Sequence, residues 1–97
     1  MKNDGVHNIE YSFGDDADLN LRMSKLLNEV VHVFRQHADG NWKGIYKPKY
    51  AKLLAEEIGQ RPSLIRKLLE LRDPVVSNIT YAAIEATKEA RNQASDS

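Results

Sequence analysis

The sequence has no cysteine, only three prolines and five glycines, and no long apolar run among its 97 residues. Without cysteine the chain can form neither a disulfide framework nor a thiolate metal site. No apolar run approaches the length that spans a bilayer, so we expect no membrane contact. Residues 1–18 contain no apolar core, and we expect no secretory signal there. These absences favour a small cytoplasmic protein.

Groups that support catalysis are equally scarce. The three histidines are His7, His32 and His37, and the last two are five residues apart, whereas ligands on one helix face are four apart. No glycine-rich phosphate loop and no serine nucleophile motif occurs. The sequence therefore predicts a protein that is not an enzyme and has no metal or cofactor.

The net charge is zero, but charges of opposite sign are separated along the chain. Residues 1–18 contain one lysine against five carboxylates, whereas residues 43–72 contain eight lysines and arginines against three glutamates. Local asymmetry of this kind influences the choice of partner more than the total charge does. We expect an acidic, flexible N-terminal arm over residues 1–17 and a basic central region.

Apolar periodicity predicts a small all-α domain of about four to five helices over residues 18–93. The expected helices cover residues 19–38, 48–59, 62–72 and 79–93. Asp18 is the expected N-cap of the first. Proline is favoured in a first helical turn, which places helix starts near Pro48 and Pro62.

Three shorter segments complete the expected organisation. Residues 9–13, IEYSF, are compatible with a short strand. The sequence of residues 42–47 is compatible with a wing, with a short strand or with a loop. In the loop, Trp42, Ile45 and Tyr46 would pack on the core. Residues 94–97 are polar, and we expect a disordered tail there.

The stretch AKLLAEEIGQRPSLIRKLLE, residues 51–70, contains a glycine and a proline inside an otherwise helical pattern. A helix that ends at Gly59 and a second helix that begins at Pro62 form a helix-turn-helix. Glycine would supply a positive φ at the turn. The other expected structural residues are a small residue where the helices cross and apolar residues that pack them together: Ala55, Ile58, Ile65 and Leu68.

These residues resemble the DNA-binding helix-turn-helix family over about 20 positions. One departure is Gln60, where the family more often has an apolar residue. The longer run over residues 58–86 also resembles the central region of ParB-type partition proteins, which implies a local fold and a DNA role. The nucleotide-binding part of that family has no counterpart here.

If residues 62–72 form the recognition helix, its outward residues face the major groove. With Ile65, Leu68 and Leu69 inward, the expected base contacts come from Arg61, Ser63, Leu64, Arg66 and Lys67. Expected phosphate contacts come from flanking basic residues, Lys43, Lys47, Lys49, Lys52 and Arg72. The lysines near the start of helix 48–59 would act together with its outward backbone N–H groups.

A single helix-turn-helix contacts few base pairs, so we expect a homodimer on two half-sites. One side of helix 19–38 is a candidate interface: Leu19, Met23, Leu26, Val30 and Phe34. Helix 79–93 is the rival, because its small residues Ala82, Ala83 and Ala86 allow close approach.

The sequence leaves two functions open. The first is a sequence-specific double-stranded DNA-binding protein, either a small dimeric transcriptional regulator or a plasmid or phage maintenance factor, acting at the nucleoid. The second is a non-catalytic protein–protein interaction module whose acidic arm binds a basic partner. A hybrid is a third hypothesis, in which the acidic arm competes with DNA for the basic surface.

Overall fold

Four α-helices and one π-helical turn form the protein in a computed structural model, which describes residues 9–96 and side chains from residue 9 to residue 90. In chain order they are α1 (Ala17–His37), η1 (Trp42–Tyr46), α2 (Lys47–Gln60), α3 (Leu64–Glu70) and α4 (Pro74–Asp96). Residues 9–96 contain no strand. The predicted all-α class is confirmed.

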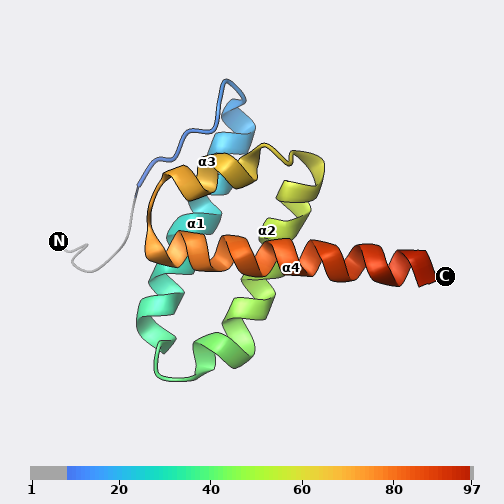
Figure 1. Ribbon diagram of the computed structural model, residues 1–97. Coiled ribbons are helices and arrows are strands. Elements are labelled where there is room, and N and C mark those ends of the chain that lie inside the picture. Colours follow the sequence, from blue (N-terminus) through green and yellow to red (C-terminus); the bar gives the residue numbers. More distant parts are fainter. Residues whose placement is uncertain (1–8, 97) are drawn as a thin grey trace.

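The helices form two crossed layers (Figure 1). α1 and α2 run in opposite directions, joined by a short turn and η1, and α4 crosses in front of both. The most extensive contact is that between α2 and α4. The C-terminal half of α4 continues past α2, away from the rest of the protein.

α1 begins earlier than predicted because Asp16, not Asp18, is its N-cap. The Asp16 Oδ1 atom accepts a hydrogen bond of 3.0 Å from the backbone N–H of Leu19. This bond is the first cause that holds the pKa of Asp16 below its usual value, and the nearby Arg61 guanidinium contributes. Asp18 instead lies in the first turn, where a negative charge also favours the helix dipole.

The described part of the N-terminal segment is neither a flexible arm nor a strand. Residues 9–14 run along α1, and the side chains of Asn20, Ser24 and Asn28 bond the backbone of alternate residues. Asn28 bonds both the N–H and the C=O of Ile9 at 2.9 and 2.8 Å. Ser24 does the same for Tyr11 at 2.8 and 3.2 Å.

Asn20 completes this series by accepting from the Phe13 N–H at 2.7 Å and donating to the Gly14 C=O at 3.0 Å. Four residues of a helix advance about 6 Å along its axis, and two residues of an extended chain advance about 6.6 Å. Every second residue of the N-terminal segment can therefore lie opposite every fourth residue of α1. Tyr11 and Phe13 are consequently buried in the core. The prediction of a flexible arm is therefore wrong for residues 9–16; residues 1–8 of that arm lie outside the described residues.

The segment over residues 42–47 is not a wing, strand or loop. It forms η1, which runs directly into α2, and the backbone N–H of Lys47 donates to the C=O of Trp42. Trp42 is buried, with its ring 5.4 Å from that of Phe34 and 6.5 Å from that of Tyr50. Ile45, expected to pack on the core, is exposed instead.

α4 starts five residues before the predicted boundary. Asp73 accepts hydrogen bonds from the N–H groups of Val75 and Val76, at 2.9 and 3.1 Å, and Pro74 occupies the first helical position. Proline suits this position because its missing N–H would have no partner there. The predicted tail over 94–97 is also corrected, since residues 94–96 belong to α4 and residue 97 lies outside the described residues.

The core explains why the predicted dimer face of α1 is not available. Leu19, Met23 and Val30 are buried, and Leu26 and Phe34 are half-buried and pack against the same core. The N-terminal segment and η1 also pack against α1, and its exposed side instead contains Leu21, Arg22 and Lys25. The prediction of this dimer interface is wrong.

Candidate nucleic-acid interface

α2 and α3 are joined by three residues, as a helix-turn-helix requires. The chain leaves α2 at Arg61, whose φ and ψ are −143° and 80° and whose N–H still bonds the C=O of Glu57. The N–H of Leu64 then bonds the C=O of Arg61 at 3.0 Å, and that of Ile65 bonds the C=O of Pro62 at 3.1 Å. These bonds start α3 two residues after its predicted start at Pro62.

Four of the predicted structural residues are packed in or against the core. Ile58 and Leu68 are buried, and Ala55 and Ile65 are half-buried against the core. Gly59 differs, because α2 continues through it to Gln60 without a positive φ. A Cβ atom added at Gly59 would meet no atom within 4 Å, so the expected steric reason for glycine is absent.

α3 has a buried side and an exposed side. Leu64 and Leu68 are buried completely, so the prediction that Leu64 contacts a base is wrong. Ser63, Arg66 and Lys67 are exposed. Within residues 9–90, Arg66 has no ion-pair partner, and its guanidinium is available to a ligand.

Two of the predicted base-contacting cations are bonded to the N-terminal segment. Arg61 forms an ion pair with Asp16 at 3.2 Å, and both side chains are partly exposed. The Lys67 Nζ atom donates to the Phe13 C=O at 2.7 Å. Any DNA contact by these two residues would compete with contacts inside the protein.

The predicted phosphate-binding lysines are distributed over η1 and α2. Lys43, Lys49 and Lys52 are exposed, and Lys47 is half-buried. Lys49 lies 5.3 Å from the centre of the Tyr50 ring. We expected free backbone N–H groups at the start of α2 to bind phosphate together with these lysines. That prediction is wrong, because η1 precedes α2 and the Trp42 C=O accepts the hydrogen bond from the Lys47 N–H.

Arg72, the last predicted phosphate contact, is exposed just beyond α3. It has a positive φ of 56°, and its N–H donates to the C=O of Leu69 at 3.2 Å. A left-handed conformation in a residue other than glycine is uncommon, and the sequence offered no signal for it.

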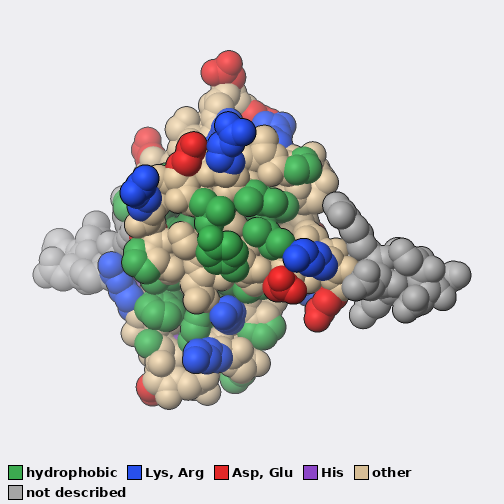
Figure 2. Space-filling view, viewed as in Figure 1, with side chains coloured by type: hydrophobic (Ala, Val, Ile, Leu, Met, Phe, Trp, Pro, Cys, Tyr) green, Lys and Arg blue, Asp and Glu red, His purple; other side chains and the backbone are tan. Residues whose placement is uncertain are grey.

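Charges on the face that α3 and α4 share are mixed rather than gathered into one basic area (Figure 2). Acidic residues next to the basic ones are partly paired: Glu57 accepts two hydrogen bonds of 3.0 Å from the Arg22 guanidinium on α1. These bonds join α1 to α2 and raise the pKa of Arg22. Between the charges the same face shows an apolar area.

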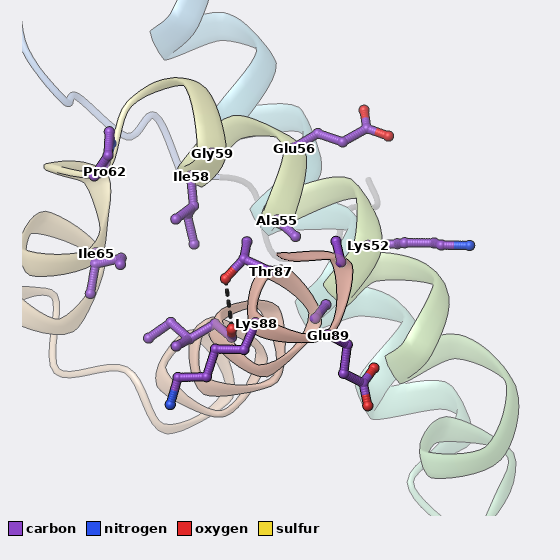
Figure 3. A pocket seen from close by; sticks show the side chains of 13 residues that line it. Lys52, Ala55, Glu56, Ile58, Gly59, Pro62, Ile65, Thr87, Lys88 and Glu89 are labelled. Atoms are coloured by element: carbon purple, nitrogen blue, oxygen red, sulfur yellow. Dashed lines mark hydrogen bonds between the residues drawn. The ribbon is translucent and has the colours of Figure 1, made fainter. Parts of the chain in front are cut away.

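An apolar groove of about 890 Å³ lies beside this helix-turn-helix, a feature that sequence reasoning missed (Figure 3). Its walls are the end of α2, the turn, the start of α3 and the C-terminal half of α4. Its lining residues come from two stretches that are distant in sequence, residues 52–65 and 84–90, so no local sequence pattern indicates the groove.

Within residues 9–90, no group of three or more His, Asp and Glu side chains could hold a metal ion. His37 packs its ring 4.4 Å from that of Tyr46. None of the described helices is both long and apolar enough to cross a membrane.

Comparison with known proteins gives no relative: no family model, no curated protein and no solved structure matches the chain.

Proposed function

We propose that the protein binds double-stranded DNA and places α3 in the major groove. The observation that supports this is the α2–turn–α3 unit, in which buried Leu64 and Leu68 anchor a short helix while Ser63 and Arg66 face solvent. An arginine fork forms two hydrogen bonds with guanine, and serine can donate to a base or a phosphate. Lys43, Lys49, Lys52 and Arg72 would contact phosphates.

The protein would act as a pair. α3 has seven residues and is about 10 Å long, which corresponds to about three base pairs. Such a short contact gives little specificity unless a second copy occupies a second half-site. The role is then that of a small regulator or a plasmid or phage maintenance factor, non-catalytic and located with the nucleoid.

The competing function is a protein–protein interaction module. It is favoured by the Asp16–Arg61 pair, which places a carboxylate next to the start of α3, and by the apolar groove. In this function the helix-turn-helix serves only as a scaffold.

Selection of bound duplexes from a random pool at near-physiological salt separates the two functions. The DNA function predicts an enriched inverted repeat with half-sites about one helical turn apart. Recovery at background level, with protein well into the micromolar range, would contradict DNA binding and favour the interaction module.

Variants then test how the site is used. Arg66→Ala should weaken binding to the selected site by about 1–3 kcal/mol and relax preference at one base. Lys49→Ala should weaken all sequences about equally and flatten the salt dependence. Lys25→Ala is the matched control, because Lys25 is an exposed cation on α1 outside the proposed interface. Equal, small effects of all three would contradict specific recognition by α3.

A further inference from the structure

An apolar groove lies beside the proposed DNA-binding surface, and Lys52 is the one proposed DNA contact that lines it. Ile58 comes from α2, Pro62 from the turn and Ile65 from α3, and they face Ile84 and Ala86 of α4. In Figure 3 the Ile58 side chain points into the space above α4, with Ile65 at its side. Ile58 is buried, whereas Ile65 and Ile84 are only half-buried, so the groove leaves part of two isoleucine side chains uncovered.

The side of α4 that packs on the core continues into this groove. Val76, Ile79 and Ala83 are buried, and the same side continues at the next turns with Thr87 and Ala90, which line the groove. The Thr87 hydroxyl donates to the C=O of Ile84 at 2.6 Å, which satisfies its polarity within the helix. Residues 84–90 of α4 therefore present small and apolar side chains, next to Lys88 and Glu89, to a space that the described residues leave open.

The edge of the groove contains charges of both signs. Glu56 on α2 and Lys88 on α4 both line it, and Lys52 and Glu89 add a second pair of opposite charges. In a two-fold pair, contacts between two positions occur twice with the roles exchanged. Each Glu56 could then meet Lys88 of the other copy, and the zero net charge of the chain adds no repulsion.

We propose that a second copy of this chain docks in the groove, with the C-terminal half of each α4 against the groove of the other. Small side chains on α4 allow the two helices to approach closely. The inference deepens the proposed function, because it names the interface of the expected pair. Ser63 and Arg66 do not line the groove, so they remain available to DNA.

Sedimentation velocity of the full chain without DNA, from about 1 to 200 μM, tests this proposal. We expect a concentration-dependent dimer for the parent protein. Ala90→Glu places a carboxylate in the groove at an exposed helical position and should weaken dimerisation at least tenfold. Asn78→Glu is the control, since Asn78 is exposed on α4 and does not line the groove. Far-UV circular dichroism checks that both variants remain folded.

Charge reversal provides the second measurement. Glu56→Lys and Lys88→Glu should each weaken the dimer several-fold, and the double variant should restore it, because the opposite charges meet again across the interface. A parent protein that is monomeric at every concentration would overturn the proposal, as would Ala90→Glu dimerising like the parent. A dimer that retains no DNA would refute the proposed DNA function and leave this interface standing.

Discussion

Replacing Phe13 with alanine tests whether the N-terminal segment is part of the folded core. Phe13 is only 2% exposed and belongs to the same apolar cluster as Leu19 and Met23. Loss of a buried phenylalanine side chain costs about 3–5 kcal/mol, through lost transfer free energy and the cavity that remains. A domain of this size has a free energy of unfolding of about 5–15 kcal/mol, so a large share is at stake.

Urea unfolding followed by the fluorescence of buried Trp42 measures this loss directly. The expected change corresponds to a fall in Tm of about 15–25 °C. Ser12→Ala is the control, because Ser12 is exposed between two buried aromatic residues and should change stability by less than about 0.5 kcal/mol. A loss below about 1 kcal/mol for Phe13→Ala would refute the packing argument and restore the flexible arm.

Two further predictions follow from local geometry. Gly59→Ala should raise the free energy of unfolding by about 0.4–1 kcal/mol, since Gly59 is helical and an added Cβ atom would meet nothing within 4 Å. Urea unfolding measures this change. A loss of stability would instead indicate the positive φ expected of a helix-turn-helix glycine. Burial, and then the hydrogen bond to Glu29, raise the pKa of Tyr50 to about 12. Because the unfolded chain ionises Tyr50 near its usual pKa of 10.0, stability should fall as the pH rises from about 10 to about 12. Tyr50→Phe should reduce that fall in pH-dependent urea titrations, and an unchanged fall would contradict the assignment.

Local sequence rules predicted the helices but misplaced their ends. The residue before a proline is pushed out of the helical region, so the end of α3 before Asp73 and Pro74 was predictable. The same two residues are also an N-cap followed by a first-turn proline, which starts α4. The dipeptide Asp73–Pro74 therefore ends α3 and also begins α4, and the prediction took only the end of α3 into account.

The burial of residues 9–16 depends on a partner that is distant in sequence. Their acidic composition indicates a solvated arm, whereas Tyr11 and Phe13 alternate along the segment like the residues of a strand with one buried side. The partner is the series Asn20, Ser24 and Asn28, spaced four apart on α1. Both patterns are visible in the sequence, but only the tertiary structure shows that they meet.

The candidate interface was predicted in its outline and not in its detail. Ser63 and Arg66 are exposed on a short helix after a three-residue turn, as the pattern indicated. Leu64 is buried because Leu64 and Leu68 together form the innermost side of α3, whereas Ile65 and Leu69, which were expected inward, are only half-buried. The contacts of Arg61 and Lys67 with the N-terminal segment join residues about 50 positions apart, which periodicity cannot indicate.

The Asp16–Arg61 pair allows a cleaner test of competition between the acidic segment and DNA than deletion of residues 1–17, which would remove core residues. Asp16→Asn keeps an oxygen that can cap α1 but removes the charge that binds Arg61. Ion pairs that water reaches are weak, so freeing Arg61 should tighten DNA binding by no more than about fivefold. Fluorescence anisotropy measures this, and the gain should shrink as salt is raised. Asp15→Asn removes the same charge from an exposed neighbour outside the pair. If both variants gain equally, the cause is general electrostatics; only a larger gain for Asp16→Asn would show that the segment withholds Arg61 from DNA.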